Sequence, residues 1–145
     1  MLALLLIPAG VQGAAMLVDE LWFHRRRGLP RWERLGHPLD TATVAACYIW
    51  LVLVPPPHGL AVYVALAVFS CLFVTKDEPV HARVCSPGEM WLHSLLFLLH
   101  PIVLGAFGWI WWSGRGAWTI RLQLALTLAF GAYQLVYWRL RWQER

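Results

Sequence analysis

Five apolar segments separated by polar joints dominate this chain of 145 residues. They run from about Leu2 to Phe23, Thr41 to Val54, Leu60 to Thr75, Met90 to Trp112 and Ala117 to Trp138. Only 14% of the residues are charged, whereas a soluble domain has about a quarter. The sequence therefore predicts an all-α, polytopic membrane helical bundle with about five transmembrane helices, in a single integral membrane domain that covers residues 1–145.

The second and third segments are shorter than the others. A spanning helix needs about 20 apolar residues, and the second segment has only the 14 from Thr41 to Val54 before three prolines end it. We expect this pair either to draw its polar ends into the bilayer or to form a hairpin that stops part of the way across.

The distribution of basic residues predicts how the spans are oriented. Because successive spans alternate in direction, the joints fall on two sides of the membrane. Only Arg115 and Arg121 lie on one side. The other side has ten basic residues: Arg25, Arg26, Arg27, Arg31, Arg34, Lys76, Arg83, Arg139, Arg141 and Arg145. By the positive-inside rule this basic side is cytoplasmic. We expect a bacterial inner-membrane protein with its N-terminus outside and its C-terminus inside, and with Trp138 and Trp142 at the inner interface.

Composition excludes several other classes. The net charge of +4 belongs to a chain of apolar segments, which favours a lipid bilayer over nucleic acid as its partner. Met1–Met16 lacks the positive charge of a secretory leader, so we expect a retained first span. Cys47, Cys71 and Cys85 form no CxxC pair, which argues against a disulfide framework or a zinc ribbon.

Pairs of possible metal ligands mark the joints on the cytoplasmic side. The four pairs are Glu20 with His24, His37 with Asp40, Glu78 with His81, and Glu89 with His93. Asp77 is next to the third pair, and His100 follows the fourth by seven residues. His58 lies in the turn on the opposite side and is excluded. Alternating spans bring all these joints to one side, so we expect the pairs to converge.

Helical spacing supports the first pair most directly. Glu20 and His24 are four residues apart and share one helix face, although such terminal residues also contact lipid headgroups. Asp19 points about 100° away from Glu20 in an α-helix, which makes it the weaker candidate.

Helix capping is an alternative role for two of the acids. Asp40 follows Pro38 at the expected start of a helix and is suited to an N-cap. Ser86-Pro87-Gly88-Glu89 fits a capping box. The histidines have no such alternative, although His100, beside Pro101, is also suited to bond a backbone carbonyl freed by that proline.

The ligand inventory favours two metal ions. Five histidines and several carboxylates together suit iron, manganese or zinc, and they outnumber the four ligands of a typical zinc site. Seven of the eight acids lie between residues 19 and 89, and two divalent cations would offset their mutual repulsion. We expect a dinuclear centre, with iron as the first choice of metal.

This pattern resembles the strategy of the membrane di-iron fatty-acid desaturases, fatty-acid hydroxylases and alkane hydroxylases over residues 20 to 100. Those families have HxxxH and HxxHH boxes, which this chain lacks. Its Glu78-x-x-His81 is closer to the spacing of ferritin-like bundles. The resemblance implies two irons at the cytoplasmic ends of the helices and leaves substrate and reaction open.

The leading hypothesis is oxygen-dependent oxidation of a lipid-soluble substrate, with electrons from a donor protein because no flavin or dinucleotide motif is present. Metal transport or sensing is a second hypothesis, which needs polar residues in the outer half of the bundle as well. A haem b protein would need a second histidine facing His100. An accessory subunit of a membrane complex is the fourth hypothesis.

Overall fold

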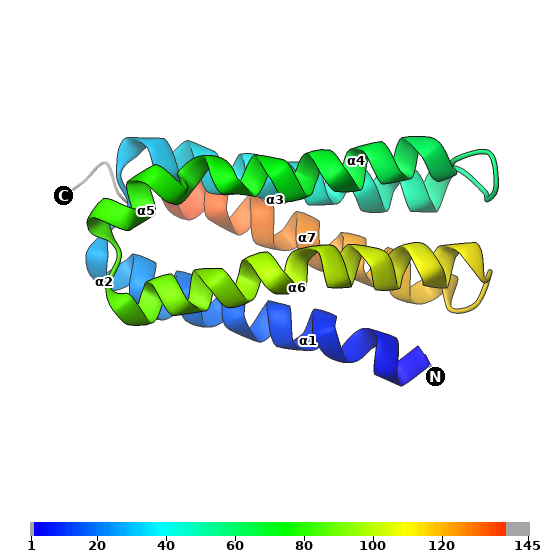
Figure 1. Cartoon of the computed structure of the whole chain (residues 1–145), viewed down its shortest axis with the longest axis horizontal. Helices are drawn as coiled ribbons and strands as arrows, with labels where there is room; N and C mark the ends of the chain where they lie inside the picture. Colours follow the sequence, from blue (N-terminus) through cyan, green and yellow to red (C-terminus); the bar gives the residue numbers. More distant parts are fainter. Residues whose placement is uncertain (1, 139–145) are drawn as a thin grey trace.

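The structure is a computed structural model that describes residues 2–138, and in this part of the chain it is helical without any strand. Its long helices are α1 (Leu2–Val18), α3 (Arg31–Leu53), α4 (Leu60–Phe73), α6 (Pro87–Trp112) and α7 (Ala117–Val136). Figure 1 shows them running along one elongated bundle. The all-α prediction is confirmed. The basic residues Arg139, Arg141 and Arg145, and also Trp142, lie outside the described residues.

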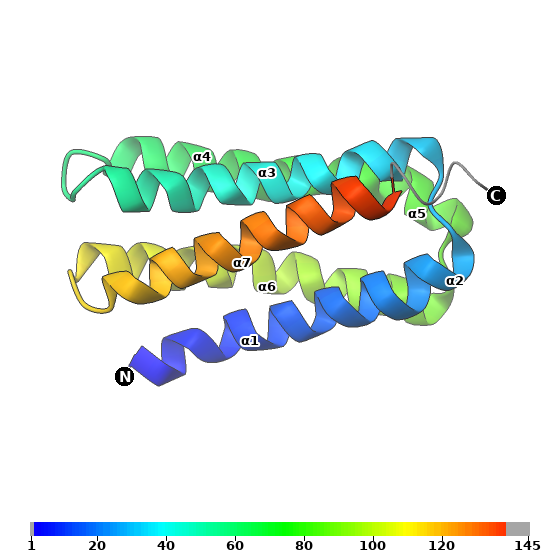
Figure 2. The ribbon, with the colours of Figure 1, turned by 180° about the vertical axis from the view of Figure 1, so that it is seen from behind.

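The polar joints gather at one end of the bundle. There α1 continues through a π-helical turn, Asp19–His24, into α2 (Arg25–Arg27). At the same end α4 continues through a 3₁₀ turn, Val74–Asp77, into α5 (Glu78–Val84). Figures 1 and 2 show α2 and α5 at this end, while the α3–α4 and α6–α7 turns lie at the other. We call the first end the polar end.

The helix that contains the second apolar segment is longer than the sequence predicts. Instead of beginning near Thr41, α3 begins at Arg31 and includes the polar residues that precede the apolar segment. Pro30 precedes its first turn, and Pro38 lies within it. Tertiary contacts stabilise this polar half, because Glu33 is fully buried and paired with Arg27. Such contacts override a weak local helix signal.

Three helical stretches are long and apolar enough to cross a membrane: Leu2–Arg27, Leu60–Val84 and Pro87–Trp112. The described helices α3 and α7 do not reach this standard. Large apolar side chains nevertheless cover the outside of all the long helices, as in Leu4, Leu53, Leu72, Leu98 and Leu126. This surface suits a lipid environment.

The apolar core lies between the polar end and the two opposite turns. Tyr48 and Leu51 of α3 pack there with Tyr63 of α4 and with Phe107 and Ile110 of α6. Tyr63 also donates a hydrogen bond of 2.6 Å to the carbonyl oxygen of Leu104. This core fixes the relative height of α3, α4 and α6, and therefore of the joints that they end in.

Candidate metal centre

The π-helical turn of the first helix brings two acids to one histidine. Asp19 Oδ2 lies 3.2 Å from His24 Nε2, and Glu20 Oε2 lies 3.4 Å from His24 Nδ1. A regular α-helix would point Asp19 away from this face. The wider i→i+5 turn places it beside a residue five positions later. The expectation that Asp19 is the weaker candidate is therefore wrong in geometry.

A first set of donor atoms is formed by two helices. Asp19 and His24 come from the first helix, and Glu89 and His93 come from the start of α6. One ligand atom of each lies within 4.8 Å of the others, and all four residues are buried. His93 Nε2 lies 3.1 Å from Asp19 Oδ1. Carboxylate and imidazole donors at this spacing can surround one transition-metal ion.

A second set of donor atoms shares no residue with the first. Glu33 and His37 of α3 meet His81 of α5, again with ligand atoms within 4.8 Å of one another. Glu33 Oε1, His37 Nε2 and both ring nitrogens of His81 are buried without a hydrogen-bond partner. Buried polar atoms are normally paired, because leaving them unpaired costs free energy. A bound cation would satisfy them.

The two sets are adjacent. The ring centroids of His24 and His37 are 4.7 Å apart, and those of His81 and His93 are 4.3 Å apart. Two further groupings span the sets: Glu20 with His24 and His37, and Cys85 with His81 and His93. We call the nine residues of these groupings the donor cluster: Asp19, Glu20, His24, Glu33, His37, His81, Cys85, Glu89 and His93.

Arg27 binds and orients two acids of the donor cluster, Glu33 and Glu89. Its Nη2 lies 2.9 Å from both Glu33 Oε2 and Glu89 Oε1. The second oxygen of Glu33 is thereby left toward His81, at 3.8 Å from Nε2. Such supporting contacts orient ligands in metal sites.

The capping box at the start of α6 is present. The Ser86 side chain accepts from the Glu89 backbone N–H, and Glu89 Oε2 accepts from the Ser86 backbone N–H. Glu89 is therefore a helix cap and an Arg27 partner, and it also lies 3.8 Å from His24 Nε2 through Oε1.

Three sequence-predicted acids lie outside the donor cluster. Asp40 and Asp77 both bind Lys76, whose Nζ is 2.6 Å from Asp40 Oδ1 and 2.8 Å from Asp77 Oδ2. Asp40 lies inside α3, so it is not an N-cap either. Glu78 is half-buried on α5, in none of the ligand groupings of the described residues. The His37–Asp40 and Glu78–His81 pairs thus each provide only a histidine.

His100 is also separate from the donor cluster. Its Nε2 is 3.0 Å from Ser70 Oγ and its Nδ1 is 3.4 Å from Gln12 Nε2. His100 lies seven residues beyond His93 on α6, a rise of about 10 Å. Both ring nitrogens are engaged by protein groups, which does not suit an axial haem ligand.

Burial shifts the pKa values of donors in the joints. Desolvation, with the neighbouring histidines, holds the pKa of His37 well below its usual range, so its imidazole is neutral and able to bind a metal. Burial raises the pKa of Glu33, while Arg27 opposes this. Burial is also the main cause that raises the pKa of Cys85 to about 12, so this thiol would need a cation to ionise.

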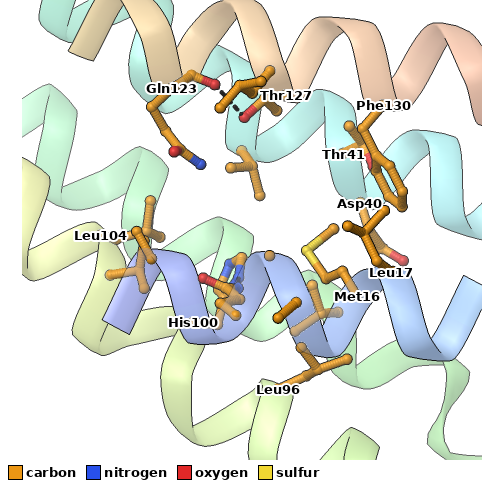
Figure 3. Close-up of a pocket in the computed structure, with 18 of the residues that line it drawn as sticks. Met16, Leu17, Asp40, Thr41, Leu96, His100, Leu104, Gln123, Thr127 and Phe130 are labelled. Carbon is orange, nitrogen blue, oxygen red and sulfur yellow. Dashed lines mark hydrogen bonds between the residues drawn. The ribbon is translucent and has the colours of Figure 1, made fainter. Parts of the chain in front are cut away.

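A mostly apolar cavity of about 570 Å³ leads from the donor cluster into the bundle. Asp19, Glu20, His37, His81 and His93 lie in its wall at the polar end. Figure 3 shows Gln123, Thr127 and Phe130 of α7 across this cavity from His100 and Leu96 of α6. The donor cluster is therefore accessible from an apolar space.

Sequence reasoning missed three members of the donor cluster. Asp19 depends on the π-helical turn, which no local signal in the sequence announces. Glu33 belongs to the extension of α3, and its spacing of four from His37 was the available signal. Cys85 follows His81 by four residues, a spacing that was the available signal, although a single thiol does not suit a copper(I) or iron–sulfur site.

No protein-family model, curated protein or solved structure matches this chain. The donor cluster and the cavity are therefore the features that indicate a function.

Proposed function

We propose that the polar end of the bundle holds two transition-metal ions, with iron as the leading candidate. The observation that carries this proposal is the pair of donor sets that share no residue and lie side by side. One ion would take Asp19, His24, Glu89 and His93, and the other would take Glu33, His37 and His81. Glu20 and Cys85 would join them as further ligands. Mixed imidazole and carboxylate donors suit iron, manganese and zinc.

We further propose that this centre oxidises a lipid-soluble substrate with dioxygen. The supporting observation is the apolar cavity, whose wall includes members of both donor sets, such as His93 and His37. In a hydroxylation, one oxygen atom enters a C–H bond and the other leaves as water. Two electrons come from a donor protein and two protons come from the surrounding water. The metals supply the redox chemistry, and the chain supplies ligands, orientation and a site that excludes water.

Metal transport is less well supported. An ion crossing the membrane needs a polar path, whereas apolar side chains such as Leu6, Val103 and Phe107 line most of the cavity beyond the donor cluster. Moving a cation through such a wall is costly.

Metal analysis of the purified full-length protein tests the proposal. Protein produced with iron and manganese supplements and purified without chelator should hold about two transition-metal ions per chain. The His37→Ala/His81→Ala variant should lose about one of them, whereas His58→Ala, at the opposite turn, should keep both. Less than half an equivalent of any metal in the wild-type protein would refute the proposal.

A further inference from the structure

Four side chains form a directional chain of hydrogen bonds beside the cavity. The Thr43 hydroxyl donates to the carbonyl oxygen of Asp40 at 2.8 Å. A hydroxyl has one hydrogen, so Thr43 must accept from Ser70 Oγ, also at 2.8 Å. Ser70 must then accept from His100 Nε2 at 3.0 Å. His100 is therefore protonated on Nε2, and its Nδ1 accepts from Gln12 Nε2 at 3.4 Å.

The direction of these hydrogen bonds determines which polar atoms of Gln12 remain available to a ligand in the cavity. One of the two N–H groups of its amide is directed to His100, so its amide oxygen Oε1 is left as an acceptor and its second N–H as a donor. Gln12 lines the cavity and makes no other hydrogen bond within residues 2–138. The complementary ligand group is an uncharged hydroxyl, which can donate to Oε1 and accept from the second N–H, because a charged group would be costly in this apolar surrounding.

The cavity is elongated along the bundle. On α1 and the adjoining π-helical turn, its wall extends from Leu6 to Glu20, and fourteen residues of helix rise about 21 Å. Most of the wall is aliphatic or aromatic, as Figure 3 shows for Leu17, Leu96, Leu104 and Phe130. This shape and lining suit a long hydrocarbon chain.

The cavity also opens toward lipid between α1 and α7. Gly10 and Gly13 of α1 line it and are exposed, and a Cβ added to either would meet nothing within 4 Å. Opposite them, Leu122 and Leu126 of α7 line the cavity and are also exposed, at 49% and 57%. These residues define a lateral window at mid-height of the bundle.

We propose that the cavity binds a long-chain alcohol from the bilayer, which enters through the window and donates its hydroxyl hydrogen to Gln12 Oε1. Gln12 precedes Asp19 by seven residues, a rise of about 10 Å. The hydroxyl is therefore held away from the donor cluster, and part of the hydrocarbon can lie beside it. That the alcohol is the substrate rests on the proposed function, whereas its binding does not.

Binding of radiolabelled 1-hexadecanol to the full-length protein in lipid nanodiscs tests this inference. Hexadecyl methyl ether, which accepts but cannot donate a hydrogen bond, serves as the matched competitor. We expect the alcohol to bind about tenfold more tightly than the ether, the factor expected for one buried hydrogen bond. Gln12→Leu should remove this preference and still bind the ether.

The window has a matched pair of variants. Gly13→Phe should reduce binding of the alcohol at least tenfold, because its ring fills the opening. Gly105→Phe should bind like the wild type, since Gly105 on α6 is exposed, has equal free space and lies outside the cavity. Equal affinity for alcohol and ether, or normal binding by Gly13→Phe, would overturn the inference. Specific binding of the alcohol by protein that holds no metal would support the inference of an alcohol site. It would refute only the proposed function.

Discussion

Asp19 Oδ2 lies 3.2 Å from Nε2 of His24, five residues further along the chain. This contact depends on the π-helical turn between them. Single π-helical turns are rare and are frequently found at functional sites. Here the turn adds an acid to a face that a regular α-helix would leave with Glu20 alone, so the local irregularity completes the first donor set.

Asp19→Asn and Glu33→Gln should each lower the metal content, by about one ion per chain. Both changes keep the size of the side chain but remove the negative charge that attracts a cation. Glu78→Gln is the matched control, because Glu78 belongs to none of the ligand groupings. Elemental analysis of the three variants checks this. Loss of metal in Glu78→Gln with full retention in Asp19→Asn would favour the pairs expected from sequence over the donor cluster.

Glu89→Gln separates capping from metal binding. Gln is accepted at this position of a capping box, so α6 should begin as before and the thermal midpoint of the metal-free variant should stay within about 3 °C of the metal-free wild type. The lost charge should weaken both the Arg27 contact and the first donor set. We expect reduced metal content with a normal circular dichroism spectrum. Full metal content would limit Glu89 to its role as a cap.

The sequence was sufficient to place four of the five candidate histidines and only some of the acids. Alternating spans put His24, His37, His81 and His93 at one end, and the structure brings them together. Glu20 and Glu89 do lie in the donor cluster, whereas Asp40 and Asp77 could not be assigned in this way because they had a competing partner. Lys76 takes Asp40 and Asp77, and only tertiary structure reveals such a pairing.

The cavity was not predictable from the sequence either. Its window depends on which face of α1 meets α7, and small residues such as Gly10 and Gly13 give no periodic signal that would define that face. The length of α3 was missed for a related reason. Its polar first half resembles a surface element until the burial of Glu33 against Arg27 is known.

Cysteine labelling tests the orientation expected from the basic residues. Arg26→Cys and Ala82→Cys at the polar end should react only with a reagent that crosses the membrane. His58→Cys and Arg115→Cys, at the opposite turns, should react in intact cells with an impermeant maleimide. Wild-type protein controls for Cys47, Cys71 and Cys85. Reaction of all four new cysteines from one side would disprove the five-span arrangement.

Lys76→Met should destabilise the bundle by about 2–3 kcal/mol, because it leaves the carboxylates of Asp40 and Asp77 largely buried without their cation.

The loss of stability in Lys76→Met should depend on pH. Burial already raises the pKa of Asp40 to about 7, and Lys76 opposes that rise, so removing the lysine raises this pKa further. A carboxyl with a raised folded-state pKa binds its proton more tightly when folded, so its contribution to stability falls as pH rises from about 4 through that pKa. Denaturant unfolding in detergent should therefore show a small deficit at pH 5 and a larger one at pH 8. Lys76→Met with Asp40→Asn and Asp77→Asn should recover stability at pH 8, and an equal deficit at both pH values would show that the ion pair is not its cause.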